Sequence, residues 1–299
     1  MTNDQFNPRI VKGYHCPSHS YCSGDWRLRN PGKWQEILEH PSHNVSFSPP
    51  LPPYHGKHYT QGGLILVAMN FNNKGDPWDA FEEISDKEDR LCWREKTLFA
   101  NAAKFLACLF KDKRLRIDAD KYYVFANIIK CSPSNQLSKR SWPSLVQLHR
   151  CVAVEGHIKH EIEDYNPGIL LCLGYEVYNH IMALYVDERL RLGEAAKPQN
   201  SVVRLDEDTL ALSLPHLSGG MQSFNTQNKQ YREGIKTMEH ISSLRGKDYA
   251  TATAFFEAED APRFDKNIVL TAMAYDMGRT LKDMAPAVYQ RIQDQLAER

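Results

Sequence analysis

The chain of 299 residues has no long hydrophobic run and no apolar stretch near its start. Its longest apolar runs, such as Ile169–Leu173, are far shorter than the roughly 20 residues that a membrane-spanning helix needs. The first ten residues, MTNDQFNPRI, do not resemble a signal peptide. These absences argue against a membrane protein or a secreted protein, and we expect a cytoplasmic one.

An excess charge of either sign is also absent, because 37 Lys and Arg residues balance 37 Asp and Glu residues. No field of the whole molecule would therefore attract a polyanion. Nucleic-acid binding, if it occurs, must use a local basic patch. Residues 111–116 (KDKRLR) and 138–142 (SKRSW) are the candidates, and solvated loops are the alternative interpretation of both.

The seven cysteines do not indicate a disulfide framework in a chain that we expect in the cytoplasm. Three have apolar or helical neighbours and are expected in the core: Cys92, Cys108 and Cys172. The other four lie in polar or turn-like segments, where burial gains little: Cys16, Cys22, Cys131 and Cys151.

Strand and helix patterns alternate after an irregular segment at residues 1–60, which is rich in Pro, His, Gly and Ser. Short apolar runs predict strands at 64–69, 122–129 and 168–173, with a fourth ending at Leu214. Helical spacing is found at 95–110, 145–165 and 175–192. This order predicts an α/β fold, a three-layer α/β/α sandwich with a central four-stranded parallel sheet. We expect one domain over residues 1–225 and a helical extension over 226–299, with its main helical segments at 227–244 and 266–296.

Polar motifs follow the four predicted strands, where ligands bind in open α/β sheets. They read AMNFNN, ANIIKCSPSN, CLGYE and LPHLSGGM. In this order, over residues 62–225, they resemble the uracil-DNA glycosylase superfamily. The middle motifs, with HIKHEIEDYNPGILLCLG, are most similar to its iron–sulfur-bearing bacterial and archaeal branch. The first motif resembles the family's G-M-N-P, with Ala68 and Phe71 in place of glycine and proline, and the last resembles H-P-S, with Leu217 in place of proline.

The resemblance implies roles for these residues in cutting an N-glycosidic bond. Asn70 would position the attacking water, and His216 would stabilise charge on the departing base. Asn127 would read the Watson–Crick edge of a base flipped out of the stack. The candidate stacking aromatics are Phe71, Trp78 and Trp93, and the candidate wedge residues that fill the vacated stack are Leu217 and Met221.

The four polar-context cysteines resemble the ligands of the family's structural cluster, although the spacing Cys16-x5-Cys22 is wider than its usual C-x2-C. Four thiolates suit a 4Fe–4S cluster or, as an alternative, zinc with His15 or His19 taking part, and free thiols are the remaining alternative. Either centre would tie the N-terminal segment to the second strand and the helix after it.

The resemblance implies a monomeric DNA glycosylase that leaves an abasic site. Its substrate would be uracil or a modified pyrimidine, since the region after the first motif departs most from the family pattern. Excision of modified bases from bacteriophage DNA, as a defence, is one alternative. A second alternative is a non-catalytic DNA-binding module on the same fold.

Overall fold

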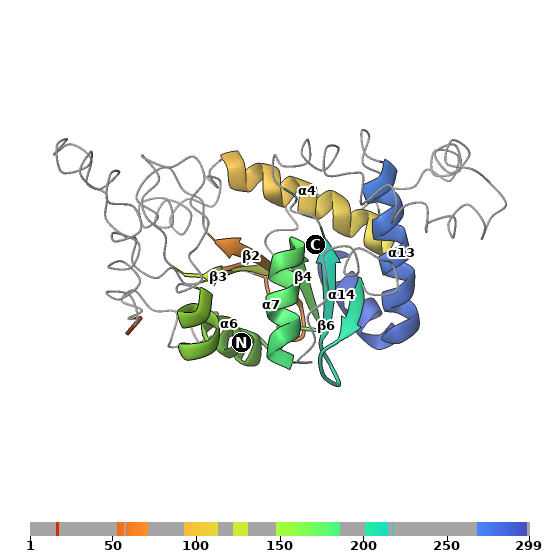
Figure 1. The fold of residues 1–299 in the computed structure, drawn as a ribbon. Coiled ribbons are helices and arrows are strands. Elements are labelled where there is room, and N and C mark those ends of the chain that lie inside the picture. Colours follow the sequence, from red (N-terminus) through yellow and green to blue (C-terminus); the bar gives the residue numbers. More distant parts are fainter. Residues whose placement is uncertain are drawn as a thin grey trace. The chain divides into compact units, whose positions relative to one another are not determined.

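The computed structural model describes residues 16–17, 53–56, 58–70, 93–112, 122–130, 148–185, 201–214, 217 and 268–297 (Figure 1). The chain divides into two compact units. The first comprises Met1–Tyr54, Val67–Trp93 and Phe125–Tyr165, and the second comprises His55–Leu66, Arg94–Val124 and Asn166–Arg299. The domain boundary predicted near residue 225 lies outside the described residues.

Six strands form one mostly parallel sheet in the order β1-β3-β2-β4-β6-β5. Their bounds are Tyr54–His55 (β1), Leu64–Asn70 (β2), Tyr123–Ile129 (β3), Ile169–Leu173 (β4), Val202–Arg204 (β5) and Leu210–Leu214 (β6). β4 and β6 run parallel, with Ile169 opposite Leu210. β5 runs antiparallel to β6. The predicted α/β class, with a mostly parallel sheet, is therefore confirmed.

The inner strands form the core because their apolar residues run without interruption. Every residue of β3, β4 and β6 is buried. A strand covered on both faces cannot alternate apolar and polar side chains, so a continuous apolar run is the expected pattern. The four predicted strands correspond to β2, β3, β4 and β6.

The predicted number of four strands is wrong, because β1 and β5 extend the sheet at its two edges. β1 has only two residues and β5 only three. Such short edge segments carry no detectable apolar pattern. The antiparallel return of β5 onto β6 follows from a tight turn, in which Asp206 Oδ1 accepts hydrogen bonds from the backbone N–H groups of Asp208 and Thr209.

Two predicted helices are observed close to their expected positions. α4 spans Trp93–Phe110 and buries Phe105, Leu106 and Leu109, as its apolar spacing predicts. α7 spans Tyr175–Tyr185 and packs against β4 and β6. Cys108 of α4 and Cys172 of β4 are buried core residues, also as predicted. Burial raises the pKa of the Cys108 thiol to about 12, so this thiol is inert at neutral pH.

The helix predicted over residues 145–165 is interrupted instead of continuous. A π-helical segment, η4 (Arg150–Val154), is followed by α6 (His157–Tyr165). Gly156 separates them with a φ of 62°, a left-handed conformation that glycine adopts without steric cost. The prediction of one helix was wrong because a single glycine changes the chain direction here.

The segment predicted as helical over residues 266–296 forms two helices. α13 (Ile268–Met284) and α14 (Pro286–Ala297) pack against each other, and both belong to the second unit (Figure 1). Pro286 begins α14, because proline cannot continue a helix but suits its first position. Gly278 of α13 lies so close to α4 that an added Cβ would be 1.9 Å from the carbonyl oxygen of Leu109.

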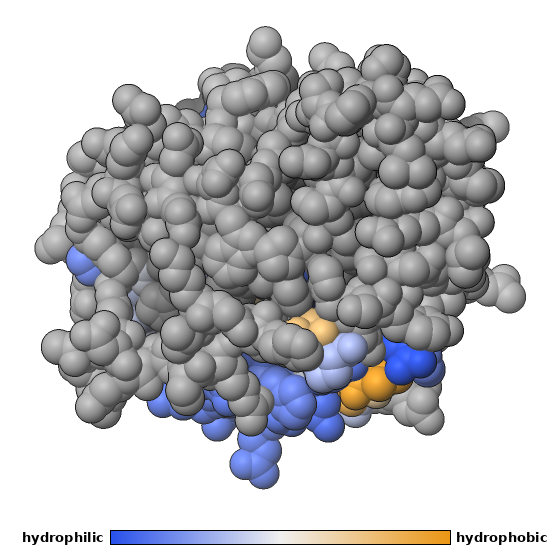
Figure 2. All heavy atoms as spheres, turned by 90° about the vertical axis from the view of Figure 1, so that its left-hand side faces the viewer, coloured by the Kyte–Doolittle hydropathy of each residue, from blue (hydrophilic) through white to orange (hydrophobic). Residues whose placement is uncertain are grey.

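Figure 2 shows one face of the molecule, on which the described atoms are mostly hydrophilic, with a small apolar area beside them. Val154 and Met284 are the exposed large hydrophobic residues within the described ranges. No helix among the described residues combines the length and hydropathy needed to cross a membrane.

Candidate functional site

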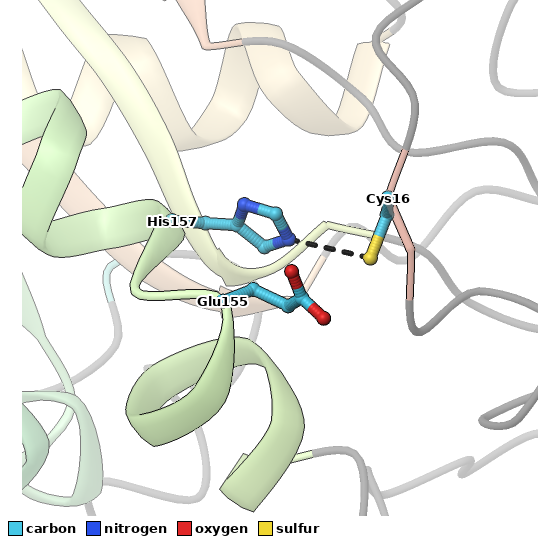
Figure 3. A group of neighbouring side chains, drawn as sticks. All are labelled: Cys16, Glu155 and His157. Carbon is cyan, nitrogen blue, oxygen red and sulfur yellow. Dashed lines mark hydrogen bonds between the residues drawn. The ribbon is translucent and has the colours of Figure 1, made fainter.

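Three side chains with metal-ligating atoms meet in the first unit, namely Cys16, Glu155 and His157. Their ligand atoms all lie within 4.8 Å of one another, and Nε2 of His157 is 3.4 Å from Sγ of Cys16. Cys16 and His157 are each only 4% exposed. Figure 3 shows the imidazole and the carboxylate both facing the thiol. The group has the ligand types and the spacing to hold a metal ion.

The junction between η4 and α6 places Glu155 and His157 on the same side. The backbone N–H of Glu155 donates to the carbonyl oxygen of Arg150 at 2.8 Å, which closes the wide π-helical turn. Gly156 then turns the chain, and its carbonyl accepts the N–H of His160 at 2.9 Å in the first turn of α6. π-Helical turns are rare and frequently occur at functional sites.

The electrostatic surroundings keep His157 neutral. Burial and, to a smaller extent, the positive charge of Lys130 lower the pKa of His157 to about 4, whereas the Glu155 carboxylate opposes this shift. A neutral imidazole keeps a lone pair on one ring nitrogen, and this is the form that binds metals. At neutral pH His157 is therefore in its metal-binding state.

A buried ion pair lies beside this group. Nζ of Lys130, directly after β3, is 2.5 Å from Oε2 of Glu161 on α6, with side-chain exposures of 2% and 11%. Burial raises the pKa of Glu161, while the ammonium of Lys130 acts in the opposite direction. We regard the pair as ionised at neutral pH because a fully buried ammonium needs a carboxylate partner. The pair joins the end of β3 to the helix that carries His157.

The predicted metal ligands are only partly described. Cys16 and Cys151 are both buried, and Cys151 lies on η4. Cys22 and Cys131, and the alternative ligands His15 and His19, lie outside the described residues. Sequence reasoning missed Glu155 and His157. The available signal was their position four and six residues after Cys151, at the start of a helix.

The predicted catalytic and base-reading residues are placed in part. Asn70 is the last residue of β2, and its side chain lies outside the description. Asn127 lies two residues before the end of β3, next to β2 in the sheet, and is 7% exposed. Its Oδ1 is buried and has no hydrogen-bond partner among the residues that the structure describes. His216 lies outside them.

The predicted aromatic and wedge residues receive one correction. Leu217 is completely buried, and its carbonyl oxygen accepts a hydrogen bond from Nδ2 of Asn101 at 2.6 Å. A side chain that enters a DNA stack must be exposed, so this position does not fit a wedge. The backbone of Trp93 begins α4. Phe71, Trp78 and Met221 lie outside the described residues.

No protein-family model matches the sequence, and no curated protein matches it significantly.

Proposed function

We propose that this protein is a DNA glycosylase, which flips a base out of DNA and hydrolyses its N-glycosidic bond. The observation that best supports this proposal is the buried Oδ1 of Asn127, which has no hydrogen-bond partner within the described part of the chain. A buried acceptor without a partner costs about 1–3 kcal/mol, so such a group is expected where a ligand supplies the missing donor. The imino or amino group of a pyrimidine edge is a donor of this kind.

The neighbouring strand supplies the second part of the proposed site. β2 and β3 are adjacent, and Asn70 ends β2 within the same unit as Asn127. In this proposal Asn70 positions the water at C1′, and the sequence-predicted His216 donates a hydrogen bond to the base as negative charge develops. Phe71, Trp78 and Trp93 are the proposed stacking residues, and Met221 is the proposed wedge.

The metal centre has a structural role in this proposal. The family resemblance implies a 4Fe–4S cluster held by Cys16, Cys22, Cys131 and Cys151, with zinc as the alternative. The buried thiol of Cys16, grouped with Glu155 and His157, supports a metal centre at this position. The metal would hold the N-terminal segment against the start of α6, and it would supply no step of base excision.

The test is base release from defined DNA under single-turnover conditions. Duplexes containing uracil, a 5-modified cytosine or ordinary bases are incubated with the protein, and abasic sites are detected by alkaline cleavage and released bases by mass spectrometry. Release of uracil or of a modified pyrimidine supports the proposal, and the two substrates distinguish repair from defence against bacteriophages. DNA binding without any base release would instead favour the non-catalytic DNA-binding module.

Asn127→Asp is the informative variant, because a carboxylate cannot offer the N–H donor that the carboxamide offers. We expect it to change which bases are accepted, favouring those with an amino donor. The matched control is Asn179→Asp on α7, whose Oδ1 is also buried without a partner among the described residues. The control should leave base preference unchanged. If both variants shift the preference equally, Asn127 does not read the base.

A further inference from the structure

The group of Cys16, Glu155 and His157 has the dimensions of a site for one metal ion. We propose that these three residues bind a single divalent first-row transition-metal ion, with zinc as the best fit, in place of a four-thiolate cluster at Cys16. This inference rests on the structural metal centre of the proposed function and names its ligands and metal class. Two of the ligands, Glu155 and His157, are not among the residues expected from the family resemblance.

The distance between the sulfur and nitrogen atoms supports one shared ion. With a Zn–S bond of about 2.3 Å and a Zn–N bond of about 2.05 Å at a tetrahedral angle, the two ligand atoms should be about 3.6 Å apart. The observed separation of Sγ and Nε2 is 3.4 Å. Each thiolate of a 4Fe–4S cluster binds a different iron, so the width of the cluster separates its ligands. The separation of 3.4 Å between Nε2 of His157 and Sγ of Cys16 therefore fits two ligands of one ion better than the ligands of two different irons.

The charges of the three ligands also match a divalent ion. A thiolate and a carboxylate together carry two negative charges, and an imidazole binds a metal ion in its neutral form. The two positive charges of the bound ion would therefore be neutralised within the group, of which Cys16 and His157 are buried and Glu155 is partly buried. Sulfur, nitrogen and oxygen ligands together suit zinc, whereas Mg²⁺ and Ca²⁺ prefer oxygen ligands alone.

The scaffold around the group holds two ligands in place before the ion binds. The Glu155 N–H bond to Arg150 and the left-handed Gly156 determine where the π-helical segment ends and α6 begins. The Lys130–Glu161 pair anchors α6 one turn beyond His157. Cys16 comes from a segment 141 residues away in sequence, so the ion would join this segment to α6.

The experiment measures metal content and cobalt spectra of the full-length protein. We expect about one zinc per chain by elemental analysis and no stoichiometric iron or inorganic sulfide. After removal of zinc, one equivalent of Co²⁺ should give the visible bands of a tetrahedral ion and a thiolate-to-cobalt charge-transfer band. His157→Gln should weaken Co²⁺ binding by at least about 10²-fold, since loss of a partner that only orients a ligand already costs 10–100-fold.

The chain offers matched controls on the same helix. His160 and Glu163 lie on α6 about half exposed, and neither is part of the group. His160→Gln and Glu163→Gln should bind Co²⁺ as tightly as the unchanged protein, whereas Glu155→Gln should weaken binding. His157→Cys is the control for misfolding, because it also replaces His157 but keeps a metal-binding side chain at this position. This variant should bind Co²⁺ with a stronger charge-transfer band from the second thiolate.

Several outcomes would overturn the inference. One is an iron content of about four atoms per chain together with inorganic sulfide. Another is a Co²⁺ affinity that His157→Gln leaves unchanged, and a third is an equal loss of Co²⁺ affinity in His157→Gln and His160→Gln. No specific binding of Zn²⁺ or Co²⁺ would also overturn it. Base release provides the separate readout. If the protein binds zinc but releases no base, only the glycosylase proposal is contradicted. If it releases a base but binds no metal at this group, only the proposed metal site is contradicted.

Discussion

Removal of one member of the buried Lys130–Glu161 pair should strongly destabilise the folded protein. Lys130→Met removes the ammonium but keeps most of the apolar stem, and it leaves the Glu161 carboxylate buried without its partner at 2.5 Å. Removing one member of such a pair typically costs about 3–5 kcal/mol. The cost has an upper limit, because Glu161 can take up a proton instead. The unfolded-state pKa of a glutamate is about 4.3, so protonating the Glu161 side chain at pH 7 costs about 3.7 kcal/mol.

The same reasoning predicts how the defect depends on pH. Glu161 in the variant has a folded-state pKa above its unfolded-state value, so the folded protein retains a proton that the unfolded chain releases. The free energy of unfolding that this retained proton contributes is therefore fully present below the unfolded-state pKa, and it is lost as the pH rises. Between pH 5 and pH 7 the loss should be up to about 2.7 kcal/mol, or 1.36 kcal/mol per pH unit.

Urea unfolding at pH 5, 6 and 7 measures both effects, with metal content held equal in all samples. Lys130→Met should be up to about 3.7 kcal/mol less stable than the unchanged protein at pH 7, and this difference should become smaller toward pH 5. The control is Lys130→Met with Glu161→Met, in which no charge is buried and most of the lost stability should return. A loss below about 1 kcal/mol in the single variant, as for an exposed pair, would refute the reasoning.

Three further predictions concern other parts of the molecule. Gly278→Ala should destabilise the protein despite alanine's advantage of about 1 kcal/mol in a helix, because the new Cβ would clash with the Leu109 carbonyl; an unchanged or raised Tm would contradict this contact. Metal-free protein should lose up to about 3 kcal/mol of stability as the pH falls from about 6.5 to about 4, because the unfolded chain protonates His157 before the folded protein does. His157→Gln should lack this part of the urea-unfolding pH profile, and an identical profile would show that another group is responsible. Asn70→Ala should slow single-turnover base release by about 10² or more with DNA affinity largely kept, since the amide acts on the water; an unchanged rate would place the chemistry elsewhere.

The sequence by itself determined the main strands and the fold class. Continuous apolar runs at β2, β3, β4 and β6 are recognisable because strands covered on both faces need an apolar side chain at every position. The helical spacing of α4 is equally local, since neighbours on one helix face are three or four residues apart. The same local patterns identified Cys108 and Cys172 as core residues.

Tertiary structure alone decided the edges of the sheet, the helix breaks and the composition of the metal-compatible group. β5 forms because a short segment pairs with the edge of β6. A strand of three residues is too short to show an apolar pattern in the sequence. Cys16 and His157 meet across 141 residues, and Lys130 and Glu161 across 31. A polar residue in a sequence shows which chemistry it offers, but its partners depend on how the whole chain folds. For this reason the cysteines stood out in the sequence, whereas the histidine and the glutamate beside Cys16 emerged only in three dimensions.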